Sequence, residues 1–496
     1  MKKNVKSYVI LPLIAIAGSL ASCGPKTEEK GIVIDFWHTF GDKPEAALQD
    51  KVDQFVKLVK ENEGVDVTVN LSYQGAYKDV PNKVNNGMRD GELPTMVIAY
   101  ADHVANYMEF ENGNAGKYVV NLDTYINDEK VGFGKERYLG DMNSSSESGK
   151  CDKEDIVRTF FEEGQHYKYE GTYSLPWMKS SEIMFYNLDA AKRCFDIGGR
   201  TGETFDASVK NEEDVIDFIE HMSWEEMMNL SRFAMDHKAN ILPDMMCPVM
   251  YDSDSNFFIS KMYQEEIPFA SIGDDGVGHI DFESGEARQK AEALLTEYAQ
   301  NVRDNLLTTK ILQEGKYSSD FFTKEQVMFA IGSSGGTGYN SPQAAAFKYG
   351  ISKVPASNNN PLYITQGPTL TLINNPSDSA KDQEAKALYA WKFMKYLTNT
   401  DINTELCIAD SQGYIPMRES SYQSEDFAAF LEEGTIYAKA ADVLLNDISG
   451  NYIVDASFKG SADLRSQVGN IIASIIGGDS ISDAFTNAIN EAKKFF

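Results

Sequence analysis

Residues 32–100 carry the alternation of elements that decides the fold class. They begin with Ile32-Val33-Ile34-Asp35-Phe36, a short apolar run typical of a strand. Apolar residues then recur at helical spacing over 46–62 and alternate as in a strand over 65–71. The same order repeats with a helix over 80–88 and a buried strand over 95–100. Strands that alternate with helices form βαβ units, so we predict an α/β fold with a largely parallel sheet.

The whole chain is long enough for two large lobes of this kind. It has 496 residues, of which 42% are hydrophobic and 24% charged, the proportions of an ordinary globular protein. No stretch of about 18 apolar residues occurs, which excludes a polytopic membrane protein. The formal net charge of −29 argues against a nucleic acid as a partner, because an acidic surface repels phosphates.

The N-terminal residues have the features of a bacterial secretion signal. Three lysines among the first six residues precede a mostly apolar stretch at 8–20 that is too short to span a bilayer. Leu20-Ala21-Ser22-Cys23 resembles a bacterial lipobox, in which the cysteine is lipidated and becomes the first mature residue. The alternative is an ordinary signal peptide with an incidental cysteine. We expect a signal peptide at 1–22, then lipidated Cys23 and a polar, flexible tether at 23–30.

Four further cysteines are widely spaced: Cys151, Cys194, Cys247 and Cys407. No C-x-x-C pair occurs, so a cysteine-based metal site has no support. One or two disulfides are compatible with an extracytoplasmic location, but their pairing stays open.

The run Gly332-Ser333-Ser334-Gly335-Gly336 follows an apolar strand and matches the G-x-S-x-G pattern of a nucleophile elbow. All six histidines precede Ser334, whereas an α/β-hydrolase of the usual chain order needs one after the serine, which argues against such an enzyme; another order of the triad has no support in the sequence. Two interpretations of the run remain. Its N–H and hydroxyl groups are suited to phosphate or sugar oxygens, or the run is simply a tight turn.

Asp252, Asp254 and Asn256 have the spacing of the first ligands in an EF-hand loop. Phe257 stands where that loop needs glycine, and Tyr263 where it needs glutamate, so a calcium site is not expected. The chain also has no P-loop, H-E-x-x-H motif or dinucleotide fingerprint. We predict neither a metal nor a cofactor.

Seven short segments occur in an order that is shared with a known family. They are IDFWH (34–38), YQGAY (73–77), LPWMKSS (175–181) with FYN (185–187), SWEE (223–226), FAIGSSG (329–335), ITQGPT (364–369) and GYIP (413–416). Together, behind the lipobox, they resemble the family 1 extracellular solute-binding proteins of ABC importers. The resemblance is strongest to the members that bind sn-glycerol-3-phosphate and spans about residues 31–470.

The resemblance implies a two-lobed periplasmic-binding-protein (Venus-flytrap) fold with the ligand in the interdomain cleft. We expect residues 31–178 and 332–366 in lobe 1, and residues 179–331 and 367–496 in lobe 2. The crossings between lobes are expected near Met178, Ile331 and Gly367, where strand ends meet Ser or Gly.

The resemblance also implies a set of ligand-binding residues. They are Tyr77, Asp102, Ser180, Ser334, Gly367, Tyr414 and Arg465. Tyr77 and Tyr414 are expected to supply aromatic surface and hydroxyls, and Arg465 to pair with a phosphate bidentately. The alternatives are core aromatics for the two tyrosines and a surface position for the arginine.

The chain departs from the glycerol-3-phosphate members at three places. Ala101 stands where they have an acidic residue, which leaves Asp102 next to it as the substitute. The loop at 252–258 lacks their tryptophans. Lys179 replaces a small polar residue and either adds positive charge for a phosphate or is solvated. These departures leave the ligand open between sn-glycerol-3-phosphate and a neutral mono- or oligosaccharide, with Arg465 and Lys179 as the discriminating residues.

We therefore predict a non-catalytic, monomeric receptor that captures a carbohydrate-type solute and delivers it to a membrane permease. Its place is extracytoplasmic, in the periplasm or on the cell surface, tethered by the lipid on Cys23. Two other classes stay open as alternatives: a secreted carbohydrate-active enzyme, and a surface scaffold or adhesin lipoprotein. Turnover of a glycoside would support the enzyme, and a protein partner without small-molecule stabilisation would support the scaffold.

Overall fold

The computed structural model describes residues 31–112, 115–140, 153–202, 208–342, 346–357, 360–408 and 413–496. The expected signal peptide, the lipidation site at Cys23, the tether and Cys151 lie outside these residues. Cys194, Cys247 and Cys407 are buried free thiols.

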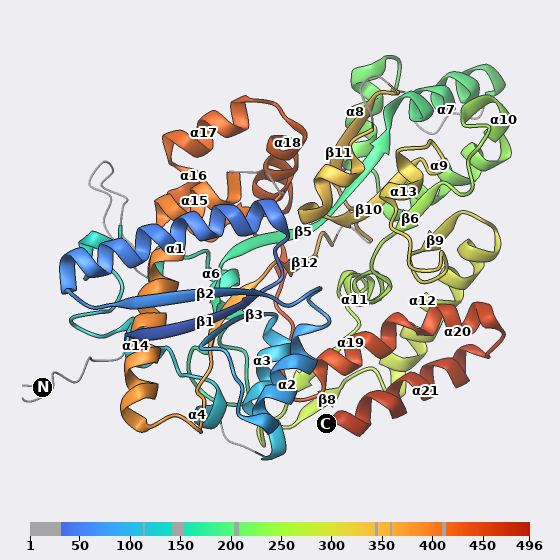
Figure 1. Ribbon diagram of the computed structural model, residues 1–496. Coiled ribbons are helices and arrows are strands. Elements are labelled where there is room, and N and C mark those ends of the chain that lie inside the picture. Colours follow the sequence, from blue (N-terminus) through green and yellow to red (C-terminus); the bar gives the residue numbers. More distant parts are fainter. Residues whose placement is uncertain are drawn as a thin grey trace, which may run out of the picture. The chain divides into compact units, whose positions relative to one another are not determined.

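The first sheet has the strand order β2-β1-β3-β13-β4. The strands are β1 (Ile32–His38), β2 (Val67–Tyr73), β3 (Met96–Ala99), β13 (Thr369–Leu372) and β4 (Leu175–Pro176). β1 pairs in parallel with β2 and β3 (Figure 1), whereas β13 is antiparallel to both β3 and β4. The prediction of alternating strands and helices over 32–100 is confirmed, because α1 (Asp42–Glu63) and α2 (Val80–Asp90) connect the three parallel strands.

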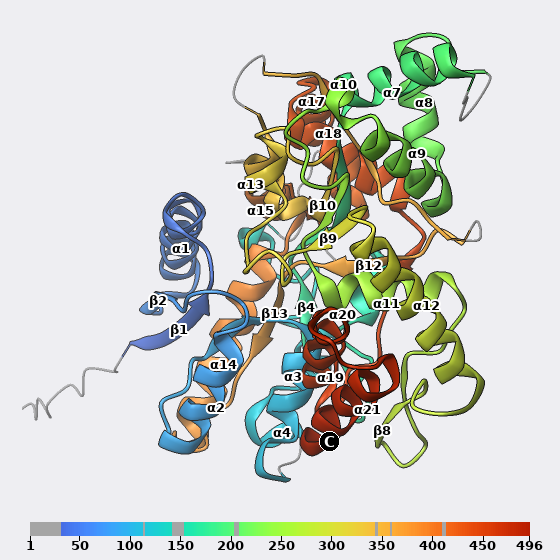
Figure 2. The same cartoon turned by 90° about the vertical axis from the view of Figure 1, so that its right-hand side faces the viewer.

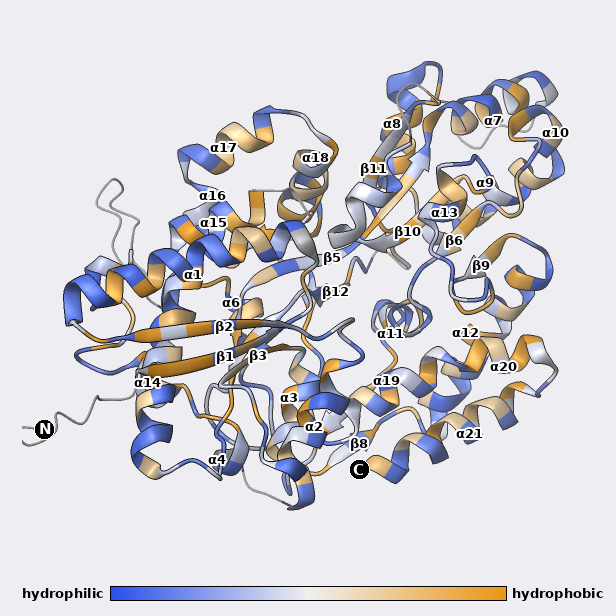
Figure 3. Ribbon diagram, in the orientation of Figure 1, coloured by the Kyte–Doolittle hydropathy of each residue, from blue (hydrophilic) through white to orange (hydrophobic). Residues whose placement is uncertain are grey.

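Helices cover both faces of this sheet. On one face, α1 and α14 (Ala380–Leu397) pack together, and the ring of Phe393 lies 4.9 Å from Phe55 and 6.2 Å from Phe36 of β1. On the other face, α2 and α3 (Ala101–Met108) pack on the remaining side chains of β3. Figure 3 shows the matching pattern, with hydrophobic residues along β1 and β2 and both kinds of residue on α1.

The second sheet has the order β15-β12-β5-β10-β6-β9, and β11 and β14 also pair with β5. Its strands are β5 (Met178–Asn187), β6 (Val249–Tyr251), β9 (Leu307–Thr309), β10 (Phe329–Ser333), β11 (Tyr349–Lys353), β12 (Tyr363–Gln366), β14 (Ile415–Pro416) and β15 (Tyr452–Ile453). All ten residues of β5 are buried, so this strand is the centre of the second core. A separate hairpin pairs β7 (Ala270–Ile272) with β8 (Gly278–Ile280).

The helices around the second sheet follow from local sequence signals. They include α7 (Leu188–Thr201), α8 (Glu212–His221), α9 (Trp224–Asp236), α11 (Asp254–Gln264), α12 (Gly285–Arg303), α19 (Ser461–Gly469), α20 (Ile471–Gly477) and α21 (Ile481–Ala492). Ser223 caps α9 with Glu226 in a capping box. Figure 2 shows α19, α20 and α21 side by side, in agreement with their mutual contacts.

The sheet pairings differ from the expected division of the chain. Residues 332–366 were expected with 31–178, but β11 and β12 pair with β5 of the second sheet. Residues 367–397 were expected with 179–331, but β13 pairs with β3 and α14 packs on β1. The chain does not cross at Ile331, because β10 runs on to Ser333 beside β5. It passes between the sheets after β4, at Trp177, and between β12 and β13, at Gly367.

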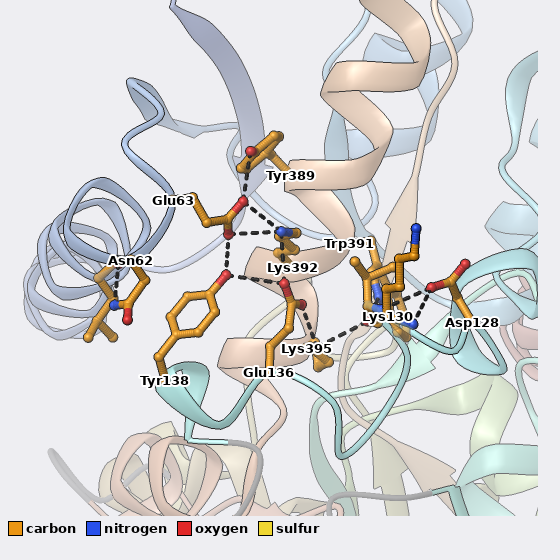
Figure 4. Close-up of polar contacts among 12 residues, drawn as sticks. Asn62, Glu63, Asp128, Lys130, Glu136, Tyr138, Tyr389, Trp391, Lys392 and Lys395 are labelled. Atoms are coloured by element: carbon orange, nitrogen blue, oxygen red, sulfur yellow. Dashed lines mark hydrogen bonds and ion pairs between the residues drawn. The ribbon is translucent and has the colours of Figure 1, made fainter.

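A buried ionic cluster joins the C-terminal end of α1 to α14 (Figure 4). Lys392 lies 2.8 Å from carboxylate oxygens of both Glu63 and Glu136, and Lys395 lies 2.7 Å from Glu136. Tyr389 and Tyr138 both donate hydrogen bonds to Glu63. The two lysines are 4% and 0% exposed, so their charges are stable there only because these carboxylates surround them.

The cluster predicts a specific loss of stability in acid. Burial raises the pKa of Glu63, but hydrogen bonds from Lys392, Tyr138 and Tyr389 outweigh it and hold the pKa below its ordinary value. A lowered folded-state pKa adds stability above the ordinary pKa, and this stability is lost as the pH falls through the folded pKa. Urea unfolding at about pH 7 and pH 3 will therefore show a smaller pH dependence for Glu63→Gln than for the unchanged protein.

The matched control is Glu61→Gln, on the same helix, whose side chain is 59% exposed and 4.0 Å from Lys57. An exposed pair of this kind contributes little, so we expect this variant to keep the pH dependence of the unchanged protein. If the free energy of unfolding changes with pH by the same amount in the two variants, the role given to Glu63 is contradicted.

Candidate functional site

The predicted site residues come from elements around both sheets, and several of them lie just after the carboxyl end of a strand. Tyr77 follows β2, and Asp102 lies in the first turn of α3 directly after β3. Ser334 follows β10 in the second sheet, and Ser180 lies near the start of β5. Open α/β sheets bind ligands outside the carboxyl ends of their strands, so these positions are chemically suited to a common site.

Tyr77 and Tyr414 face each other. Burial raises the pKa of Tyr77 well above its ordinary value, with smaller contributions from the neighbouring Tyr414 and Tyr100. Burial likewise raises the pKa of Tyr414 to about 12, so both phenols are neutral at physiological pH. The ring of Tyr77 lies 4.9 Å from that of Tyr100, and its buried hydroxyl has no hydrogen-bond partner among the described residues.

Glycines bring Ser334 next to Tyr414. Gly413 has φ +72°, and a Cβ there would lie 1.8 Å from the carbonyl oxygen of Ser334, so only glycine fits. A Cβ on Gly335 would lie 3.0 Å from the Tyr414 ring. Ser334 itself is 0% exposed, and in the described part of the chain its hydroxyl has no partner. Ser334 and Tyr414, 80 positions apart in the sequence, are thus neighbours.

Gly367 and Ser180 lie together where the chain passes from β12 to β13. Ser180 is 2% exposed and pairs with Gln366 across the β5–β12 ladder. Gly367 has φ +96°, and a Cβ there would lie 2.1 Å from the carbonyl oxygen of Met178. The close approach of these two backbones explains the glycine.

Arg465 lies among acidic and amide groups. Its Nη1 donates to Asn256 Oδ1 at 3.0 Å, and its Nε lies 4.0 Å from Asp102 Oδ2. Asn256 in turn donates through Nδ2 to Glu182 Oε1 at 3.0 Å, and Tyr251 donates its hydroxyl to the other oxygen of Glu182. A polar chain therefore runs from α3 through α19 and α11 to β5.

The carboxylates around Arg465 outnumber it. Burial raises the pKa of Glu182 to about 7, and Arg465 opposes this effect. Burial also raises the pKa of Asp455, again against the effect of Arg465, and Tyr263 donates a hydrogen bond to that carboxylate. The guanidinium is therefore already the counter-ion of the protein's own acidic groups.

Lys179, the second expected cation, is fully engaged. It is 1% exposed, and its Nζ lies 2.7 Å from Glu163 Oε2. Thr365 donates its hydroxyl to the other oxygen of Glu163. The expectation that Lys179 is either solvated or available to a phosphate is therefore wrong, because the side chain is buried in an internal ion pair.

A narrow apolar recess lies beside Tyr414. It is a small hollow of about 20 Å³, room for about one water molecule, lined by Phe40, Pro44, Ala47, Leu48, Trp177, Met178, Leu406 and Tyr414. The rings of Phe40 and Trp177 meet edge-on, with centroids 5.4 Å apart. Trp177 is 1% exposed, yet its indole N–H has no acceptor among the described residues.

The family model described as "Bacterial extracellular solute-binding protein" matches residues 53–431. The chain belongs to this family. No curated protein sequence matches it. Membership agrees with the prediction of a binding protein that does not act as an enzyme.

Three solved structures illustrate the fold of this solute-binding protein. The GacH receptor of Streptomyces glaucescens is 15% identical, with a TM-score of 0.63 over 94% of this chain and 99% of the receptor. MalE3 of T. maritima, solved with maltose, is 12% identical, with a TM-score of 0.61 over 94% and 100%. UgpB of Mycobacterium tuberculosis, solved with glycerophosphocholine, is 15% identical, with a TM-score of 0.61 over 93% and 98%. The predicted two-lobed α/β fold is thereby confirmed.

Among the described residues, no three His, Cys, Asp or Glu side chains are grouped so that they could hold a metal ion. In the 252–254 loop, Asp252 instead accepts the backbone N–H of Ser318 at 2.6 Å, and Asp254 accepts that of Ile311 at 3.4 Å. Within the same described residues, no helix is both long and apolar enough to cross a membrane.

Sequence reasoning missed several residues of this region. Trp177 and Phe40 line the recess, Glu182 and Asn256 lie beside Arg465, and His38 has a buried Nε2 without a partner in the described chain. His38 and Trp177 stood inside the segments that carried the resemblance, which was the signal available for them. Glu182 had no such signal, because the acidic groups of this chain are too numerous to single one out.

Proposed function

We propose that this solute-binding protein is the receptor of an ABC importer and that its solute is an uncharged sugar or oligosaccharide. The proposed contacts are Tyr77, Asp102, Ser180, Ser334, Gly367, Tyr414 and Arg465. The observation that carries the choice of an uncharged solute is the neutralisation of both cations by carboxylates of the protein itself.

A phosphate ester fits this environment poorly. A dianion placed at Arg465 would also approach Asp102, whose Oδ2 lies 4.0 Å from the guanidinium Nε. Two like unit charges about 4 Å apart repel by roughly 4 kcal/mol near a protein surface, which offsets much of the attraction that the arginine offers. Lys179 cannot compensate without leaving Glu163 as an unpaired, 11% exposed carboxylate.

Neutral hydroxyls fit better. Tyr77, Tyr414 and Ser334 present hydroxyls that are both donors and acceptors, and those of Tyr77 and Ser334 have no partner among the described residues. A buried polar group without a partner costs about 1–3 kcal/mol, which a sugar hydroxyl recovers on binding. Structural neighbours were solved with acarbose, maltose and glycerophosphocholine at similar TM-scores, so the fold leaves the solute open, and the charge of the site supports a neutral one.

The site supports a receptor mechanism rather than a reaction. Tyr77 and Asp102 belong to the first sheet and its helices, whereas Ser180, Ser334 and Arg465 belong to the second. A solute that contacts both groups stabilises the form in which they are close, and only such differential contact shifts the conformation. We propose that this closed form docks on a membrane permease and that a lipid on Cys23 keeps the monomeric receptor at the outer face of the membrane.

Thermal unfolding of the purified protein tests this function. We expect stabilisation by at least one neutral sugar among glucose, maltose, maltotriose and cellobiose, and none by sn-glycerol-3-phosphate or glycerophosphocholine. A solute at a hundred times its dissociation constant adds about 2.7 kcal/mol to the free energy of unfolding, which is readily measured.

Stabilisation by the phosphate esters alone would overturn the uncharged-solute proposal while leaving the receptor in place. If no solute of the panel stabilises the protein, or if the protein releases a reducing sugar from maltotriose or cellobiose, the proposal of a sugar receptor is overturned.

A further inference from the structure

Arg465 extends from α19, and a residue of the neighbouring helix α11 holds its guanidinium. Its Nη1 donates to Asn256 Oδ1 at 3.0 Å, and its Nε lies 4.0 Å from Asp102 Oδ2. The arginine side chain is 30% exposed and Asn256 only 7%, so the amide is the more deeply buried of the two groups. Asn256 therefore favours one of the many rotamers that are open to an arginine.

The orientation of Asn256 is fixed in turn by Glu182 of β5. Asn256 Nδ2 donates to Glu182 Oε1 at 3.0 Å, and the hydroxyl of Tyr251 donates to the other carboxylate oxygen. An ionised carboxylate only accepts hydrogen bonds, so it faces the NH2 group of the amide and leaves the amide oxygen for Arg465. The opposite orientation would set the NH2 group against the guanidinium, with donor facing donor.

Protonation of Glu182 removes this constraint. A protonated carboxyl group donates as well as accepts, so it can pair with either side of the Asn256 amide. Glu182 is 4% exposed, and burial raises its pKa to about 7, although hydrogen bonds from Tyr251 and Asn256 and the charge of Arg465 oppose this effect. Both forms of the carboxyl group are therefore populated near neutral pH.

Other titratable groups surround these contacts, and a pH experiment has to separate them from Glu182. The titratable or charged neighbours of Glu182 are Tyr251, Asp252 and Arg465. Those of Arg465 are Tyr100, Asp102, His103, Glu182, Tyr263 and Asp455. Burial raises the pKa of Asp455 as well, so a variant of Glu182 is needed to assign any pH dependence to it.

We propose that Glu182 and Asn256 are positioning residues, which hold Arg465 toward the solute as long as the carboxyl group of Glu182 is ionised. This proposal rests on the proposed function, because Arg465 is one of the proposed contacts. The two residues act on the solute through the guanidinium. Once Asn256 is free to turn, Arg465 samples its other rotamers, and binding has to order it again at a cost in affinity.

The test is isothermal titration of the full protein with glucose, maltose, maltotriose and cellobiose at about pH 8 and about pH 6. We expect protonation of Glu182 to weaken the binding of at least one sugar about tenfold, the usual effect of losing one hydrogen bond to a charged group. With a pKa of about 7, the affinity then falls about fivefold from pH 8 to pH 6. An affinity that stays constant or rises over this range contradicts the proposal.

The same linkage predicts that binding releases protons. The solute binds the ionised form more tightly, so it lowers the pKa of Glu182 and displaces roughly 0.4 of a proton at about pH 7. Binding heats in buffers of different ionisation enthalpy measure this number. Uptake of protons on binding would show that the solute prefers the protonated form, the reverse of the proposal.

Glu182→Gln keeps the shape of the side chain and, like the protonated acid, both donates and accepts. We expect it to bind about tenfold more weakly at about pH 8 and to lose the pH dependence and the proton release. The control is Glu220→Gln on α8, because burial also raises the pKa of Glu220, whose charged neighbours include His221, Lys353 and Asp447. This control should bind as the unchanged protein does. A pH dependence that survives in Glu182→Gln assigns it to another group and refutes the proposal.

A double variant, Glu182→Gln with Asn256→Asp, reverses the polarity of these contacts. The amide at position 182 then donates to a carboxylate at position 256, which accepts from Arg465. A carboxylate paired with an arginine has a lowered pKa, so we expect most of the lost affinity to return, with equal values at about pH 8 and about pH 6. A folded double variant that binds no better than Glu182→Gln would overturn the proposal. If sugars bind with no pH dependence, the receptor function stands and this inference fails; if no sugar binds, both fail.

Discussion

Replacing Gly367 by alanine will lower the free energy of unfolding by about 3 kcal/mol. The backbone at this position has φ +96°, and a left-handed conformation costs a non-glycine residue roughly 1–2 kcal/mol. The new Cβ would also lie 2.1 Å from the carbonyl oxygen of Met178, a backbone atom of the β5 residue that pairs with Pro416 of β14. Relieving such an overlap costs roughly a further 1–3 kcal/mol. Urea unfolding at neutral pH measures the sum.

Gly64→Ala separates the two contributions. Gly64 ends α1 with φ +74°, but nothing lies within 4 Å of the position its Cβ would take. This variant should therefore lose only about 1 kcal/mol. If Gly367→Ala costs no more than Gly64→Ala, the close approach of the two backbones is not a constraint on the chain.

Replacing Lys179 by methionine will cost roughly 3–5 kcal/mol, the usual result of breaking a buried ion pair from one side. Lys179 is 1% exposed, lies against the ring of Phe160 at 5.5 Å and is 2.7 Å from Glu163, which is itself 11% exposed. Removing the ammonium leaves Glu163 with a charge that its surroundings hydrate poorly. Urea unfolding of the single variant measures this cost.

The double variant Lys179→Met, Glu163→Gln should recover part of the loss, because no unpaired charge then remains. The surface control is Lys192→Met, whose partner Glu212 lies 2.6 Å away with side chains 36% and 31% exposed. There we expect a loss within about 1 kcal/mol. A single variant no less stable than this control would show that the Lys179–Glu163 pair contributes nothing.

Local sequence patterns were sufficient for most individual elements. The strand predicted at 65–71 is β2 at Val67–Tyr73, and the helix predicted at 46–62 is α1, which begins four residues earlier. These features depend on the spacing of neighbouring residues, which the chain displays directly.

The partners of the elements were not predictable in the same way. The β12 and β13 strands are separated by two residues, yet they belong to different sheets, and no periodicity distinguishes their destinations. The site shows the same limit. Lys179 and Arg465 were expected to discriminate between a phosphate and a neutral sugar, but their partners Glu163 and Asp102 come close to them only in the folded chain. The sequence shows which residues are charged, but it does not show which oppositely charged residues lie beside them in the folded protein.

The strands of the first sheet come from distant parts of the chain, and this has a consequence for folding during synthesis. Its strands β1, β2 and β3 come from the first hundred residues, but β13, which covers the free edge of β3, is synthesised some 270 residues later. Until that segment emerges, a nascent chain exposes an unpaired apolar strand edge, the kind of surface that aggregates. A chain assembled in this order benefits from staying unfolded until it is complete. An exported protein meets that requirement if it crosses the membrane as an extended chain and folds only on the far side.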